Sequence, residues 1–201
     1  GEPMDPFRLC VAFGPVAIYL LLIGAINLTR RPFLVSGGRE MAALALAVAG
    51  LMIVGPIELF FPTSASVRFG PYVWVLLLLL YCLVVVLVLL LLRPRITVYN
   101  ISIDELRPIL ADLVTHLDSE SRWAGDALVL PTLKVQLSLE PTAGMRNVSL
   151  AAVGPEQDPA GWRRLEAALA DALAVFEVPR NPRGYSFVAA GLLTLAVLVL
   201  A

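Results

Sequence analysis

The segment that decides the fold class runs from Tyr72 to Leu92 and reads YVWVLLLLLYCLVVVLVLLLL. It contains no charged residue, and a helix rises 1.5 Å per residue. The hydrocarbon core of a bilayer is roughly 30 Å thick, so about 20 apolar residues in helical conformation cross it. The segment therefore predicts a transmembrane helix.

Three other apolar runs carry the same signal: Leu9 to Leu28, Met41 to Phe61, and the shorter run Tyr185 to Ala201. The first run has no basic region before it and no small-residue cleavage site after it, so we expect a retained span and not a cleaved signal peptide. The sequence thus predicts four transmembrane helices. Residues 1–93 hold the first three (about 9–28, 41–61 and 72–92), and residues 184–201 hold the fourth.

The overall composition agrees with a membrane protein. Of the 201 residues 59% are hydrophobic and 15% are charged, whereas soluble domains are about 45–50% apolar and about 25% charged. Cys10 and Cys82 both lie in apolar runs, where cysteine behaves as a small apolar residue, and their number and spacing predict no disulfide framework or zinc site. All basic residues except Lys134 are arginine, a bias typical of bacterial proteins.

The arginines predict the orientation of the spans, because cytoplasmic connections of membrane proteins are enriched in Lys and Arg. The connection between the second and third spans contains a single basic residue, Arg68. The first connection and both ends of the 94–183 segment are richer, and we expect the following residues to lie at the membrane surface near anionic headgroups: Arg30, Arg31, Arg93, Arg95, Arg180 and Arg183. This pattern predicts an inner-membrane protein with its N-terminus outside and residues 94–183 in the cytoplasm.

Residues 94–183 have the alternating patterns of a small folded domain. Ile96 and Val98 predict a strand, and apolar residues at helical spacing follow from Ile103 to Leu117. After Asp118 the apolar residues alternate with polar ones, which predicts an antiparallel meander, and Asp158-Pro159 predicts the start of a second helix. The expected fold class is therefore a membrane α-helical protein with an inserted two-layer α+β cytoplasmic domain, in the order strand, helix, meander, helix.

Small residues in the second span predict close helix packing. Ala43, Ala47 and Gly50 share one helical face, and small side chains let two helix backbones approach. Gly14-Pro15 and Gly55-Pro56 each predict a kinked or loosened helix, either as a tolerated bend or as a gating hinge.

Few polar residues qualify as functional candidates. Glu58 is the only ionisable residue within a predicted span, and we expect its carboxylate to reach water near the outer membrane boundary. His116 is the only histidine and has no partner at a catalytic or metal-binding spacing. Asn-x-Ser/Thr sequons begin at Asn27, Asn100 and Asn147, and we interpret them as chance matches on the cytoplasmic side.

These observations favour a non-enzymatic membrane subunit that anchors or scaffolds an assembly and docks a protein partner through its cytoplasmic domain. No catalytic, metal-binding or cofactor-binding motif is present, and residues 94–183 hold nine basic and twelve acidic side chains, a balance that disfavours nucleic acid. The alternative is a homo-oligomeric channel or small transporter with a regulatory domain. Glu58 and the two Gly-Pro pairs are its only support.

Overall fold

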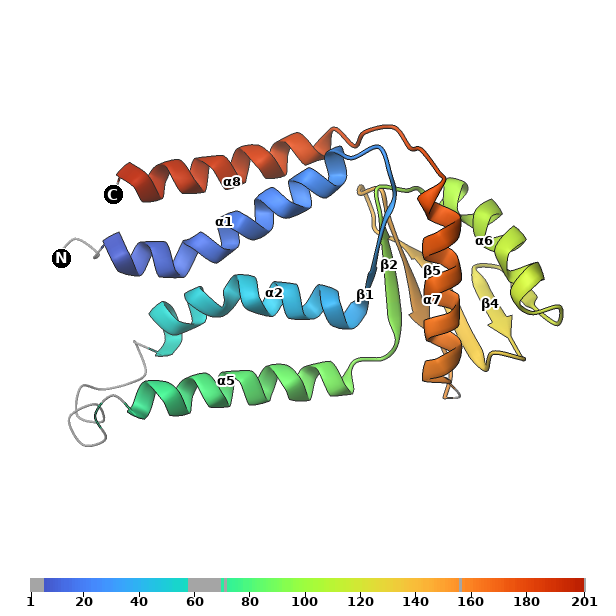
Figure 1. Ribbon diagram of the computed structural model, residues 1–201, viewed down its shortest axis with the longest axis horizontal. Coiled ribbons are helices and arrows are strands. Elements are labelled where there is room, and N and C mark those ends of the chain that lie inside the picture. The colour runs from blue at the N-terminus through green and yellow to red at the C-terminus, as the bar shows by residue number, and fades with distance from the viewer. Residues whose placement is uncertain (1–5, 58–69, 71, 156, 201) are drawn as a thin grey trace. The chain divides into compact units, whose positions relative to one another are not determined.

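The computed structural model describes residues 6–57, 70, 72–155 and 157–200 (Figure 1). The chain divides into two compact units. The helical unit comprises Gly1–Gly24, Met41–Leu92 and Tyr185–Ala201, and the sheet unit comprises Ala25–Glu40 and Arg93–Gly184. The sheet unit therefore includes the first connection between apolar helices as well as the segment between the third and the fourth.

Four long apolar helices are present: α1 (Pro6–Leu28), α2 (Gly37–Met52), α5 (Tyr72–Leu91) and α8 (Arg183–Leu200). Three described segments are long and apolar enough to cross a membrane, namely Pro6–Leu28, Gly37–Gly55 and Arg183–Leu200. In α5 the corresponding apolar stretch, Val75–Leu91, is shorter. The described residues therefore contain three candidate membrane-spanning helices, and the structure does not establish four spans.

The two Gly-Pro pairs have different local structures. Gly55 and Pro56 lie in a π-helical turn, η1 (Ile53–Ile57), that follows α2. Proline lacks the N–H of an α-helical hydrogen bond, and a π-turn is one way to accommodate that loss. Pro15, in contrast, lies inside α1, which continues on both sides of it.

Small residues bring the backbones of α1, α2 and α8 together (Figure 1). A Cβ atom added at Gly50 of α2 would lie 1.8 Å from the Val11 carbonyl oxygen of α1. A Cβ atom added at Gly191 of α8 would lie 2.8 Å from the Leu21 side chain of α1. Helix α1 thus has α2 and α8 as close neighbours. Helix α5 contacts α2, because the Tyr81 hydroxyl donates a hydrogen bond to the Ala45 carbonyl oxygen (2.6 Å).

The face predicted for helix packing is only partly covered. Ala47 and Gly50 are buried, as are Ala12 and Ala17 of α1. Ala43 is exposed and lines a shallow apolar groove between α1 and α2.

The sheet unit contains a six-stranded antiparallel sheet in the order β1-β2-β6-β5-β4-β3. The last four strands along the chain form the predicted meander. The strands are β1 (Phe33–Ser36), β2 (Arg95–Tyr99), β3 (Arg122–Ala124), β4 (Ala127–Leu130), β5 (Val135–Pro141) and β6 (Asn147–Ala152).

Strand β1 is the element that the sequence analysis did not predict. It comes from the connection between α1 and α2 and pairs with β2 in the register Phe33↔Tyr99 through Ser36↔Ile96. Its four residues lie between basic and glycine-rich stretches, and alternation over so short a segment carries little signal. The edge of the sheet is therefore formed by a segment more than 50 residues away in sequence from its partner strand.

One face of the sheet forms the core with helices α6 (Ile103–Leu117) and α7 (Pro159–Ala174). Val98, Leu137 and Leu150 of the sheet are fully buried, and so are Leu110 of α6 and Leu169 of α7. This is the two-layer arrangement that the sequence predicts, with the amphipathic faces of both helices on the sheet.

The end of α6 and the start of α7 are fixed by aspartates. Asp158 caps α7 by accepting a hydrogen bond from the Ala160 N–H (3.0 Å). Asp118 follows α6 and accepts hydrogen bonds from Glu120 N–H (3.0 Å) and from the backbone and hydroxyl of Thr132 (2.8 and 2.9 Å). Asp118 is 2% exposed, and these bonds satisfy its buried carboxylate.

Replacement of Gly50 by alanine tests the contact between α1 and α2. The new methyl group would overlap the Val11 carbonyl oxygen, so the helices must separate. We expect Gly50→Ala to lower the free energy of unfolding by roughly 1–3 kcal/mol, the usual cost of overpacking. The measurement is the thermal unfolding midpoint in mild detergent, which should fall.

Gly14→Ala is the matched control, because a Cβ atom there meets nothing within 4 Å. Equal unfolding midpoints for Gly50→Ala and wild type would show that the two backbones do not approach as described.

Candidate functional site

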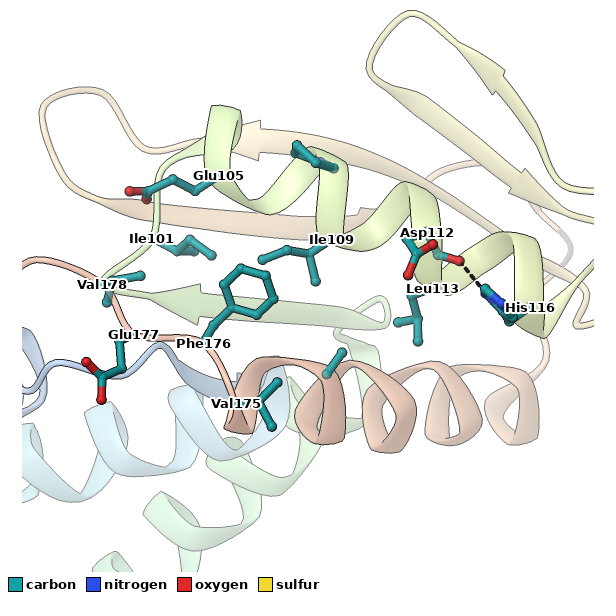
Figure 2. A pocket seen from close by; sticks show the side chains of 12 residues that line it. Ile101, Glu105, Ile109, Asp112, Leu113, His116, Val175, Phe176, Glu177 and Val178 are labelled. Carbon is teal, nitrogen blue, oxygen red and sulfur yellow. Dashed lines mark hydrogen bonds between the residues drawn. The ribbon is translucent and has the colours of Figure 1, made fainter.

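The principal candidate site is a groove of about 690 Å³ in the sheet unit, between α6 and the chain that follows α7 (Figure 2). Its apolar lining includes Ile109 and Leu113 from α6 and Val175, Phe176 and Val178 from the α7 side. Figure 2 shows the Phe176 ring projecting toward Ile109. Val175 is 82% exposed and Phe176 is 44% exposed, so large apolar side chains remain uncovered here.

The charged side chains of the groove are acidic. Glu105 and Asp112 lie on α6, Glu177 lies opposite, and no Lys or Arg is among the residues that line it. No ion pair within the described part of the chain involves Asp112 or Glu177. The groove therefore combines an apolar floor with uncompensated negative charge.

His116 lies at the same groove, near the end of α6. One ring nitrogen, Nδ1, is 2.9 Å from the Asp112 carbonyl oxygen one turn earlier, and the residue is exposed. The described residues contain no group of three or more His, Cys, Asp or Glu side chains that could hold a metal ion. The structure thus places His116 on the lining of the groove, beside Asp112.

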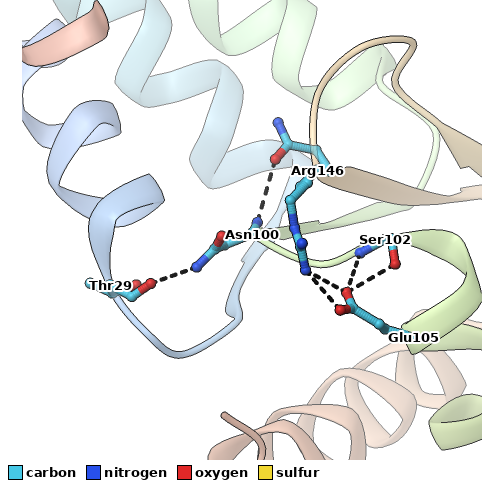
Figure 3. Close-up of polar contacts among 6 residues, drawn as sticks. Thr29, Asn100, Ser102, Glu105 and Arg146 are labelled. Carbon is cyan, nitrogen blue, oxygen red and sulfur yellow. Dashed lines mark hydrogen bonds and ion pairs between the residues drawn. The ribbon is translucent and has the colours of Figure 1, made fainter. Parts of the chain in front are cut away.

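Glu105 connects the groove to a polar cluster (Figure 3). Its carboxylate accepts hydrogen bonds from the Ser102 N–H and hydroxyl (both 2.9 Å) and from the Arg146 guanidinium (2.7 and 2.8 Å). Burial opposes ionisation, but the bonds from Ser102 and Arg146 outweigh it and hold the pKa of Glu105 below its usual value. Glu105 therefore fixes the start of α6 to the turn before β6.

Asn100 joins this cluster to the segment after α1. It adopts a left-handed backbone conformation (φ 63°), which asparagine tolerates better than most residues, and its Nδ2 donates to the Thr29 carbonyl oxygen (2.7 Å). Figure 3 shows this bond beside the Arg146–Glu105 pair. The fully buried Oδ1 atom of Asn100 accepts no hydrogen bond from the residues that the structure describes.

The three sequon asparagines are buried in the sheet unit. Asn27 and Asn181 are both 3% exposed and hydrogen bonded to each other (3.0 Å), and Asn147 is 7% exposed. The Val178 N–H also donates to the Arg30 carbonyl oxygen (2.9 Å). These asparagines serve the fold, which agrees with reading the sequons as chance matches.

A second polar cluster on the sheet centres on Glu40, in the first turn of α2. One carboxylate oxygen accepts a hydrogen bond from the Thr97 hydroxyl (2.8 Å), and the other accepts one from the Tyr99 hydroxyl. Thr97 also contacts the Ser149 hydroxyl (3.3 Å). Glu40 carries no local signal in the sequence, because its partners lie 57 and 59 residues away and only the pairing of β1 with β2 brings them close.

The other residues singled out from the sequence lie as follows. The six arginines expected at the membrane surface are all exposed members of the sheet unit, and Arg95 is 3.7 Å from Glu140. Cys10 and Cys82 are both exposed on apolar helices. Glu58 lies outside the described residues.

Comparisons with known proteins return no relative. No protein-family model matches the chain, no curated protein matches it, and no solved structure matches it.

Replacement of Glu105 by glutamine tests the polar cluster beside the groove. Because folding lowers the pKa of this carboxyl from its ordinary value of 4.5, its contribution to stability is present above that pH and is lost as pH falls through the lowered pKa. At pH 7 we expect Glu105→Gln to lower the free energy of unfolding by about 1 kcal/mol, a value reduced for partial exposure.

Thermal unfolding at pH 7 and at pH 3 measures this effect. The gap between wild type and Glu105→Gln should be smaller at the lower pH, because protonation of Glu105 removes the charge that its partners stabilise. Glu120→Gln, which changes an exposed carboxylate, should leave stability unchanged at both. A gap of equal size at the two pH values would contradict the assignment.

Proposed function

We propose that this protein is a non-enzymatic, four-span membrane subunit that anchors or scaffolds a membrane assembly. In this proposal its sheet unit faces the cytoplasm and docks a protein partner through the groove beside α6. The observation that carries the proposal is the open apolar groove of the sheet unit. The sheet of this unit contains strands from two different connections between apolar helices.

The pairing of β1 with β2 supports the fourth span. Paired strands lie on the same side of a membrane, so the chain from Ser36 to Arg95 must cross it an even number of times. The apolar helices described between these residues are α2 and α5. If α2 crosses the membrane, α5 must cross it in the opposite direction. Its described apolar stretch, Val75–Leu91, is shorter than the other three.

The positions of the arginines support the orientation. The six arginines expected at the membrane surface belong to the same unit, so the basic connections share one side of the bilayer. The positive-inside bias assigns that side to the cytoplasm. The sheet unit is then cytoplasmic and the N-terminus is outside.

The apolar floor of the groove supports docking. It consists of aliphatic and aromatic side chains, two of which, Val175 and Phe176, are exposed. Exposed apolar surface of this kind marks sites of interaction with another protein.

Accessibility of introduced cysteines tests the topology. With Cys10 and Cys82 changed to serine, we expect Gly38→Cys and Ala143→Cys to be shielded from a membrane-impermeant thiol reagent in intact cells. Both positions are exposed, and a Cβ atom at Gly38 meets nothing within 4 Å.

Ser64→Cys, in the connection with a single arginine, should be labelled under the same conditions. Labelling of Gly38→Cys and Ala143→Cys without permeabilisation would invert the orientation. Labelling of only one of Gly38→Cys and Ala143→Cys would contradict the inference that β1 and β2 lie on the same side of the membrane.

Purification in mild detergent tests the assembly. We expect a different membrane protein to co-purify in stoichiometric amount and to remain bound through size-exclusion chromatography. A symmetric homo-oligomer with a water-filled axis would instead support the channel or transporter alternative.

A further inference from the structure

We propose that the groove beside α6 binds a basic amphipathic helix of a partner protein. This inference rests on the proposed docking function and adds the chemistry and the shape of the docked segment. Three features carry it: the length of the groove, its apolar floor and the sign of its charge.

The length of the groove matches a short helix. The lining residues of α6 recur at positions i, i+3, i+4, i+7, i+8 and i+11, so they form one continuous stripe: Glu105, Pro108, Ile109, Asp112, Leu113 and His116. At 1.5 Å per residue the stripe is about 16 Å long, which is about three helical turns. A docked helix of that length presents apolar anchors at i, i+3 or i+4, and i+7.

The floor of the groove supplies the apolar contact. Ile109 and Leu113 line it from α6, and Val175 and Phe176 line it from the chain after α7. Figure 2 shows the Phe176 ring directed toward Ile109. Val175 and Phe176 follow α7, and helix α7 already packs on the core through Leu165 and Leu169, so the exposed pair is not needed to hold the helix. Burial of apolar surface under a partner stabilises the complex in proportion to the area covered.

The charge of the groove selects a basic partner. Asp112 and Glu177 lie on its two sides without an ion pair in the described chain, whereas Arg146 already neutralises Glu105. Lys or Arg side chains flanking an apolar helix face would meet both free carboxylates, and an acidic helix would be repelled. Cytoplasmic segments of membrane proteins are rich in Lys and Arg, so a neighbouring membrane protein carries the required chemistry.

Binding of a defined peptide to the full-length protein tests the proposal. The probe is a synthetic 18-residue helix with a leucine face and lysines elsewhere, and its control carries glutamate in place of lysine. The protein is held in nanodiscs of zwitterionic lipid, with Cys10 and Cys82 changed to serine and a fluorophore attached at Thr115→Cys, an exposed position outside the groove lining. Binding to empty nanodiscs is subtracted.

We expect saturable binding of the lysine peptide and none of the glutamate peptide. The double substitution Asp112→Lys, Glu177→Lys should weaken binding about tenfold at low salt, and Phe176→Ser should weaken it by a similar factor. The matched control, Glu120→Lys with Asp171→Lys, changes the net charge equally at exposed residues outside the groove and should change affinity less than twofold.

Equal binding of the two peptides, absence of binding to wild type, or equal weakening by the control pair would each overturn the proposal. The proposed function is tested separately by the partner that co-purifies in mild detergent. If that partner binds the Asp112→Lys, Glu177→Lys protein as strongly as wild type, the groove assignment is wrong and the membrane assembly stands.

Discussion

The backbone pairing of β1 with β2 is the constraint on which the rest of the structure depends. It joins the connection after α1 to the strand after α5 and turns two separate interhelical segments into one sheet unit. Side chains and backbone reinforce the join at Asn27–Asn181, Arg30–Val178 and Thr29–Asn100. Each bond satisfies a polar group whose burial without a partner would cost free energy. Residues 25–40 are therefore held at several points, in addition to the four residues of β1.

Glu40 extends this constraint to the first turn of α2. Its two carboxylate oxygens accept the hydroxyls of Thr97 and Tyr99 on β2, so the strand pair and the start of the helix are fixed together. Glycine at position 37 lets the start of α2 lie close to Arg95 of β2, because an added Cβ atom would lie 3.1 Å from the Arg95 Cβ atom. Within the helical unit, the small residues Gly50 and Gly191 let neighbouring helix backbones approach closely.

The groove lies on the helical layer of the same sheet unit. Residues on one side of α6 enter the core, as Leu106 and Leu110 do, while the neighbouring stripe through Asp112 and Leu113 stays open. Helix α7 covers the sheet but ends before it closes over this stripe, and Phe176 and Val175 follow it in the open. A two-layer domain with one uncovered helix face has room for a third helix. This is the physical basis for placing a partner there.

The sequence by itself determined the apolar helices and the order of elements between Arg95 and Ala174. Those features follow from local periodicity, since the helix and strand repeats and the long uncharged runs are written in neighbouring residues. Asp158 and Pro159 indicated the start of the second helix for the same reason. Only the tertiary structure decided that Phe33 to Ser36 form an edge strand, that Glu40 meets Thr97 and Tyr99, and that Phe176 faces Ile109 across a groove. Each of these joins residues more than 50 positions apart, and no local pattern encodes a contact over that separation.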